Sequence, residues 1–500
     1  MPDCRGVACR YNALSSLGRV WYRWTGHPWE QPLARIQAYY GAAVAMYFAL
    51  LAHSTAWLVL PALAGAAVYV HQAAAGRAGV PELPVYAAFV ALWGSAMCDA
   101  WKRRQVTLAM EWGMTEFEEA EAARPEFNAH PHVERMASPV TGMQIFWYDV
   151  RKRRRAILVS WACMAVLVLV VVGCVFGIFV LRALLLSLEA GGELPAGYAV
   201  NIAAIVNAIQ INVLNAIYSV VAVKLNDWEV HETETDYMEN LVAKTFMFQA
   251  INSFFNLYYV AFVKNNVAFF GVAQPCLKND AGAPDCLLEL QTQLRGVFIT
   301  RLVVGNLTEA VIPALLRLWR TRGEPRRGAR GAIPPASLAD QARLPAYRGL
   351  DDYLEIVIQF GFTFLFVTAY PLVALLALLS SVVELRVDAY KLLHDAARPE
   401  PRGAEDIGTW FAVLRIMCVA SLVTNAAVVC FTNPDGPFGL SDTFSRVAVF
   451  VVRAHPNPNP NRPKARGARA RAVVHTITLP QLGLRARCAV LHVYIGRGGS

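Results

Sequence analysis

Charged residues are scarce in this chain of 500 residues, of which only 17% are Asp, Glu, Lys or Arg while 56% are hydrophobic. Soluble globular proteins carry charge at about a quarter of their positions, so the composition argues against a soluble globular protein. Several apolar runs are long enough to cross the hydrocarbon layer of a bilayer. Because a backbone in lipid must satisfy its own hydrogen bonds, those runs predict helices. We therefore expect an all-α, multi-pass integral membrane protein.

The sequence also lacks the common short signatures of catalysis and of soluble metal or nucleotide binding. It contains no CxxC pair, no EF-hand calcium loop, no nucleotide-binding loop and no motif that pairs a nucleophile with a base. The net charge of +9 is typical of the cytosolic loops of a membrane protein and does not indicate a nucleic-acid partner. Residues 1–40 are polar and basic, so no cleavable signal peptide is expected. We expect no enzyme, and any calcium sensing must lie within the membrane.

The apolar runs divide the chain into three parts. Residues 1–40 form a cytosolic N-terminal segment, residues 41–432 a transmembrane domain, and residues 433–500 a low-complexity tail rich in Pro, Asn, Arg and Ala. That tail is expected to be a disordered extension, with contact to anionic lipid as the alternative. About nine spans are predicted, at 41–70, 84–101, 156–182, 197–224, 244–264, 287–314, 353–370, 372–390 and 410–431.

Positive charge orients these spans in the membrane. The loops that follow spans two, six and eight are rich in basic residues, as in RKRRR (151–155) and RLWRTRGEPRRGARG (317–331), whereas the intervening loops are poor in them. Basic loops stay in the cytosol, so the N-terminus is predicted to be cytosolic, in a plasma membrane or endomembrane protein. The loop 265–286 then faces outside, where Cys276 and Cys286 are candidates for a disulfide.

Five carboxylates fall at one predicted depth near the cytosolic ends of three spans. Glu309 lies near the end of span six, and Asp352 and Glu355 share a helix face at the start of span seven. Glu384 and Asp388, four residues apart, share a face at the end of span eight. Anions at such depth need compensation, and Ca²⁺ prefers carboxylate oxygens. Two Ca²⁺ ions are therefore expected; the alternative is that each acid snorkels to the interface or pairs with a basic group.

Polar side chains also recur within spans four to six. At this frequency they indicate either a water-filled groove through the membrane or hydrogen bonds between neighbouring helices. Basic residues among them suit anions or lipid phosphates. The candidates for a groove or pore are Asn207, Asn212, Asn215, Gln249, Asn252, Arg295 and Arg301.

Ordered motifs from about residue 31 to about residue 432 resemble one known family. They include ALWGSAMCDAWKRRQ at span two, LNDWEVHETETDYMENLVAKTFMFQAINSFFNLYYVAFVK at spans four and five, EIVIQFGF at span seven and VELRVDAYKL at span eight. The chain resembles the anoctamins, which are calcium-activated chloride channels and phospholipid scramblases. The resemblance implies passage of chloride, other anions or lipid headgroups along a polar groove, gated by Ca²⁺ bound between spans six, seven and eight.

The resemblance also implies which residues hold the two ions. Its carboxylate ligands fall on Glu309, Asp352, Glu355, Glu384 and Asp388. A family Asn one turn before the span-six acid falls on Gly305, next to Asn306, and another before the span-eight acids falls on Ser380. A third calcium site of the family includes an acid of span two, which falls on Asp99.

The chain departs from the family pattern at three places. The family's large cytosolic N-terminal domain and its tenth span have no counterpart, so the chain reads as truncated at both ends, and a homodimer is possible but weakened. A basic pore position of span six falls on Thr300, with Arg301 adjacent. Two alternatives to a channel or scramblase remain open: a calcium-independent membrane tether or scaffold, and a secondary transporter whose membrane acids carry coupling ions.

Overall fold

The computed structural model describes most of the chain before residue 433 and two short segments after it. The described residues are 14, 16–21, 27, 29–76, 79–138, 142, 144–192, 195, 198–264, 268–269, 272–273, 276, 285–300, 344–432, 476–478 and 485–487. They belong to two units, Met1–Ala454 and His455–Ser500, which are considered separately.

The first unit is built from helices, as the sequence predicts. In chain order they are α2 (Leu33–Tyr40), α3 (Ala42–Ala75), α4 (Leu83–Glu111), α5 (Pro125–Asn128), α6 (Val150–Ala190), α7 (Tyr198–Trp228), α8 (Glu234–Tyr258), α9 (Cys286–Thr300), α12 (Gly349–Leu365), α13 (Val373–Tyr390) and α14 (Thr409–Ala427). Three π-helical turns extend α8, α13 and α14: η1 (Tyr259–Val263), η5 (Lys391–Asp395) and η6 (Val428–Thr432).

Strands are few and short. In the loop before α6, β1 (Glu134–Ala137) pairs antiparallel with β2 (Gln144–Trp147), with Glu134 opposite Trp147. Before α9, β3 (Ala268–Phe269) pairs with β4 (Val272–Ala273). In the second unit, β5 (Thr476–Thr478) pairs with β6 (Arg485–Arg487), also antiparallel. Each pair is a separate two-stranded sheet, and the described residues are mainly helical, so the all-α class is confirmed.

The helices start where the sequence supplies caps. The Asp149 side chain accepts a hydrogen bond from the Arg151 amide at the start of α6, and the Thr233 hydroxyl accepts one from the Asp236 amide at the start of α8. Such caps satisfy amides that have no partner within the helix. Gly76, at φ +63°, ends α3 in the left-handed conformation that glycine adopts without strain.

Among the described residues, five helices are long and apolar enough to cross a membrane: α3, α4, α6, α8 with η1, and α14 with η6. Each of them overlaps one of the predicted spans. Helices α7, α9, α12 and α13 also fall on predicted spans, at 197–224, 287–314, 353–370 and 372–390. The multi-pass membrane character is thereby supported, and the number nine stays a prediction.

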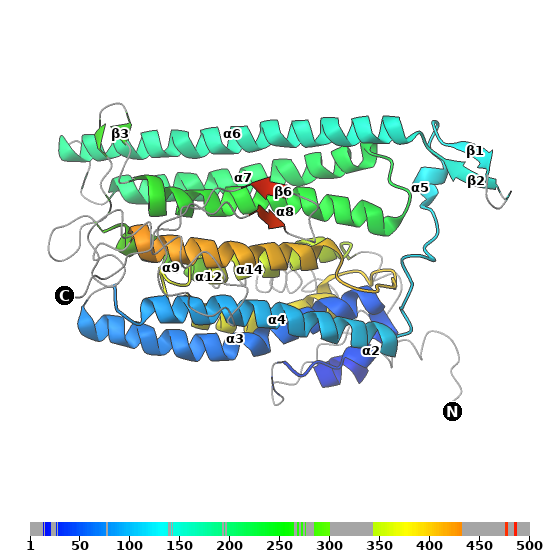
Figure 1. Cartoon of the computed structure of the whole chain (residues 1–500), viewed down its shortest axis with the longest axis horizontal. Helices are drawn as coiled ribbons and strands as arrows, with labels where there is room; N and C mark the ends of the chain where they lie inside the picture. The colour runs from blue at the N-terminus through cyan, green and yellow to red at the C-terminus, as the bar shows by residue number, and fades with distance from the viewer. Residues whose placement is uncertain are drawn as a thin grey trace, which may run out of the picture. The chain divides into compact units, whose positions relative to one another are not determined.

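The helices of the first unit lie side by side, with their long axes roughly parallel in Figure 1. Helix α6 packs on α7 and α8, α3 packs on α4 and α13, and α12 packs on α14, α13 and α8. Helices α12 and α13 lie deep in this packing, since Val357, Val373 and Ala377 are fully buried. At Gly361 the contact is so close that an added Cβ would lie 2.3 Å from Met417 and from Phe254.

A short N-terminal helical segment, residues 16–21, closes one end of the unit. Leu17 and Trp21 are buried there beside Phe48 of α3 and Leu385 of α13. The Trp21 carbonyl accepts a hydrogen bond of 3.0 Å from the Arg386 guanidinium, so this segment is fixed to α13. It therefore packs against the part of α13 that carries two of the predicted carboxylates.

Candidate functional site

Helices α12 and α13 bring their predicted carboxylates to the same end of the unit. The two helices are antiparallel, because Gln359 donates to Ser381 while Lys391, after α13, reaches Asp352 in the first turn of α12. Glu384 and Asp388 lie on the last two turns of α13. The i, i+4 spacing and the short connection between the two helices thus bring residues from the start of α12 close to residues from the end of α13.

Three of these carboxylates are buried. Asp352, Glu384 and Asp388 have exposed fractions of 5%, 8% and 3%, and Glu355 is half-buried. The Tyr47 hydroxyl of α3 donates to Asp388 and lies within electrostatic reach of Glu384 and Asp352 as well. Tyr47 thus links the carboxylates of α12 and α13 to α3.

Asp352 has two differently placed oxygens. Its Oδ1 lies 2.6 Å from the Lys391 ammonium. Its Oδ2 is buried, and the Tyr347 hydroxyl interacts with the same carboxyl group. A buried carboxylate is costly, and a cation near it would reduce that cost.

The donor chemistry of this end fits a hard cation. All four side chains offer carboxylate oxygens, which Ca²⁺ prefers, and three of the four side chains are buried. In the ranges that the structure describes, however, no three Asp, Glu, His or Cys side chains come close enough to hold a metal ion. Glu309 and Asn306, the predicted ligands from span six, lie outside the described residues. The described carboxylates therefore form one side of a candidate site.

The predicted third-site residue lies elsewhere. Asp99 is exposed on α4 and does not join the carboxylates of α12 and α13 in a metal-holding group within the described ranges. Its neighbour Cys98 is buried, with its Sγ 3.5 Å from the Cys418 Sγ of α14.

The polar residues of α7, α8 and α9 bond to one another where the structure describes them. Asn252, 2% exposed, donates to Asn215 at 2.9 Å and accepts from Gln210 at 3.5 Å, and Asn256 donates to Gln293 at 3.2 Å. These contacts support the helix-to-helix interpretation for Asn215 and Asn252. The other groove candidates have no such bond shown. Gln249 is half-buried and Arg295 exposed; the side chains of Asn207 and Asn212, and all of Arg301, lie outside the described residues.

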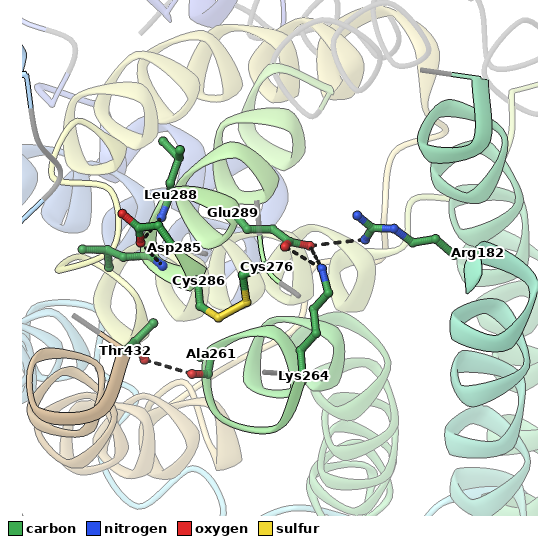
Figure 2. Close-up of a disulfide and its surroundings, with 10 residues drawn as sticks. Arg182, Ala261, Lys264, Cys276, Asp285, Cys286, Leu288, Glu289 and Thr432 are labelled. Carbon is green, nitrogen blue, oxygen red and sulfur yellow. Dashed lines mark hydrogen bonds and ion pairs between the residues drawn. A yellow bond between two sulfur atoms is a disulfide. The ribbon is translucent and has the colours of Figure 1, made fainter. Parts of the chain in front are cut away.

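A second buried cluster of charges lies beside a disulfide that joins Cys276 to Cys286, with a Cα–Cα distance of 4.9 Å (Figure 2). Glu289 of α9 binds the Lys264 ammonium at 2.5 Å and the Arg182 guanidinium of α6 at 3.3 Å. Two cations against one anion leave this cluster with an excess positive charge. Neither Arg182 nor Lys264 was among the sequence candidates, although Arg182 interrupts an apolar run and Lys264 follows one.

The start of α9 is fixed at the same place. Asp285 accepts hydrogen bonds from the amides of Leu287 and Leu288, at 2.9 and 3.1 Å, and so caps the helix (Figure 2). The cap and the disulfide together fix the first turn of α9, which places Glu289 against Lys264.

Comparison with known proteins identifies the family of this chain. A family model described as "Anoctamin: Calcium-activated chloride channel" matches residues 36–457. This chain belongs to the anoctamin family. The resemblance in the motifs is thereby confirmed, and the match covers every helix from α3 to α14.

Curated relatives are anoctamins as well. Human anoctamin-7 is 30% identical over 487 residues, which cover 85% of this chain and 52% of the relative. Human anoctamin-3 is 29% identical over 474 residues, covering 83% of this chain and 48% of the relative. Bovine anoctamin-4 is 28% identical over 485 residues, covering 85% and 51%. The chain spans about half the length of the curated relatives it matches.

Proposed function

We propose that this anoctamin passes chloride, other anions or phospholipid headgroups across a membrane under the control of Ca²⁺. The observation that carries the proposal is the burial of Asp352, Glu384 and Asp388 at one end of a chain whose family model is described as a calcium-activated chloride channel. Buried acids at the end of membrane helices are costly unless they serve a site, and here they offer only oxygen donors.

The residues that would hold calcium are Asp352, Glu355, Glu384 and Asp388, together with Glu309 and Asn306 of span six, and two ions fit their combined charge. Bound Ca²⁺ supplies the positive charge that offsets the mutual repulsion of these carboxylates. Helices α12 and α13 are fixed by their packing, so the carboxylates that they carry form the stationary side of the site. We propose that span six completes the site and that Gly296 of α9 is the point about which it bends.

The permeating group is proposed to be anionic because of the charges near the disulfide. Arg182 retains 18% exposure of its side chain, while Lys264 and Glu289 are buried at 5% and 3%. Arg182 is the most accessible of these three charged groups, so its guanidinium is the group that attracts chloride or a lipid phosphate.

Reconstitution into liposomes tests this function. Chloride efflux and exchange of a labelled phospholipid are measured with and without Ca²⁺, for the wild type and for Glu384→Gln with Asp388→Asn. We expect Ca²⁺ to stimulate at least one of the two fluxes in the wild type. The double variant should need about a hundredfold more Ca²⁺, since each of the two lost ligands costs about 1.4 kcal/mol, or about tenfold in affinity.

Two results would contradict the proposal. Fluxes that do not respond to Ca²⁺ in correctly inserted wild-type protein would favour a tether or scaffold. A double variant that responds at the wild-type Ca²⁺ concentration would show that the acids at the end of α13 are not ligands. Glu126→Gln, at an exposed residue with 72% side-chain exposure, is the matched control and should behave as the wild type.

A further inference from the structure

Lys391 occupies a particular position next to the candidate calcium site. It caps the C-terminus of α13 and begins the π-helical turn η5, three residues after Asp388. Single π-turns within helices frequently mark functional positions, because they shift the residues that follow onto another face. Here the turn places the Lys391 ammonium 2.6 Å from Asp352 Oδ1, on the facing helix α12.

Buried carboxylates elsewhere in the unit also have lysine partners, and the comparison is informative. The two oxygens of Glu229 bind Lys244 at 2.6 Å and His231 at 3.0 Å, and both oxygens of Glu289 bind Lys264 at 2.5 Å. Those lysines are 1% and 5% exposed. Both are ion pairs whose charged groups are enclosed.

The pair of Lys391 with Asp352 differs in its exposure. The Lys391 side chain is 28% exposed, while Asp352 is 5% exposed. The ion pair is formed through Oδ1 of Asp352 alone. The ammonium sits on a flexible four-carbon stem, so it can leave Asp352 along the exposed side without breaking the packing of either helix.

We propose that Lys391 is a tethered cation that competes with Ca²⁺ for Asp352 and thereby sets the calcium concentration at which the site fills. This inference rests on the proposed function. Lys391 neutralises Asp352 before a metal binds, which allows the carboxylate to be buried. A divalent ion at Asp352 must displace the ammonium, because two cations sharing that carboxylate repel each other. Part of the free energy of Ca²⁺ binding at Asp352 is therefore used to displace Lys391.

Competition predicts a rise in calcium affinity when the Lys391 charge is lost, which a purely structural ion pair would not produce. Loss of the Lys391 charge removes the competitor, so calcium affinity should rise, while loss of a merely structural contact would leave affinity unchanged or lower it. In the absence of Ca²⁺ the same variant should be less stable, because Asp352 is left buried without a counter-charge. Affinity and calcium-free stability should therefore change in opposite directions.

The experiment compares Lys391→Met, Lys391→Gln and Lys391→Arg with the wild type, as full-length chains in detergent. Calcium binding is measured directly by radiolabelled Ca²⁺, and melting temperatures are measured with and without Ca²⁺. We expect Lys391→Met and Lys391→Gln to bind Ca²⁺ about tenfold more tightly, a change of about 1.4 kcal/mol. Both should melt at a lower temperature without Ca²⁺ and show a larger shift on its addition. Lys391→Arg keeps the positive charge, so its calcium affinity should stay within about twofold of that of the wild type.

Lys152→Met is the matched control, since Lys152 is exposed on α6, which is not among the helices packed on α12 or α13. It changes the net charge by the same amount and should leave affinity unchanged. In an Asp352→Asn background, Lys391→Met should no longer raise affinity, because the group for which lysine and calcium compete is gone.

The outcomes separate this inference from the proposed function. If the wild type binds Ca²⁺ and neither Lys391→Met nor Lys391→Gln binds it more tightly, the competition is refuted while the function stands. If the effect of Lys391→Met persists in Asp352→Asn, the lysine acts elsewhere and the inference is again wrong. If the wild type binds no Ca²⁺, the proposed function fails, and the inference fails with it.

Discussion

Replacing Glu229 by Gln should destabilise this anoctamin strongly, without any direct effect on the calcium site. Glu229 lies in the turn between α7 and α8 with a side chain that is 0% exposed, 2.6 Å from the Lys244 ammonium and 3.0 Å from His231 Nε2. The Gln variant leaves the ammonium of Lys244, itself 1% exposed, without its counter-charge. Breaking one partner of a buried ion pair costs about 3–5 kcal/mol, so we expect a loss in that range.

Unfolding in mixed detergent micelles, followed by tryptophan fluorescence, measures this loss. Glu126→Gln is the control, because Glu126 is 72% exposed and its contact with Arg124 is long, at 3.8 Å; exposed pairs contribute about 0–1 kcal/mol. Adding Lys244→Met to Glu229→Gln should recover part of the loss, since no unpaired charge then remains. A Glu229→Gln variant as stable as Glu126→Gln would refute the argument, because it would show that Lys244 reaches water or another anion.

Two further properties can be checked on the same purified protein. Burial, together with four neighbouring carboxylates, raises the pKa of Glu118 from 4.5 to about 7. The folded protein therefore binds this proton more tightly than the unfolded chain, so its stability should decrease as the pH rises from 5 to 8. The stability of Glu118→Gln should decrease less over the same interval. Melting curves at both pH values measure this difference. The Cys98 and Cys418 Sγ atoms lie 3.5 Å apart, so a thiol oxidant such as diamide should join α4 to α14. Peptide mapping without reductant should find that link, and its absence after full oxidation would contradict the packing of these two helices.

The helical architecture could be predicted from composition, because long apolar runs in a membrane form helices that satisfy their own backbone hydrogen bonds. Apolar runs at 41–70, 84–101 and 410–431 became α3, α4 and α14, although the helices extend past the apolar run where polar residues continue the turn, as at the end of α4. The β1–β2 hairpin was not predicted. Its strands are four residues each, and a pattern that short in a polar loop carries too few alternations to distinguish a strand from a turn.

The candidate site was predictable only in its anions. Acids spaced three and four residues apart near the end of an apolar run are easily recognised, because ionised side chains are costly in lipid and therefore rare outside functional sites. Their partners do not stand out. Tyr47 lies near the start of the apolar helix α3, where a tyrosine has no distinguishing sequence signal, and its contact with Asp388 spans 341 positions. Lys391 follows the span at a place where any cytosolic lysine would be unremarkable.

What distinguishes Lys391 is a side-chain property that only the folded chain has. The sequence places three lysines, Lys244, Lys264 and Lys391, near the ends of predicted spans with nothing to rank them. In the structure two are enclosed at 1% and 5% exposure and the third remains 28% exposed, although all three bind a buried carboxylate. An enclosed pair cannot exchange its cation without unfolding its surroundings, whereas a pair with one exposed partner can. The exchangeable pair is also the one formed by a predicted calcium ligand, which is why exposure, rather than charge or spacing, singles out Lys391 as the residue that tunes the site.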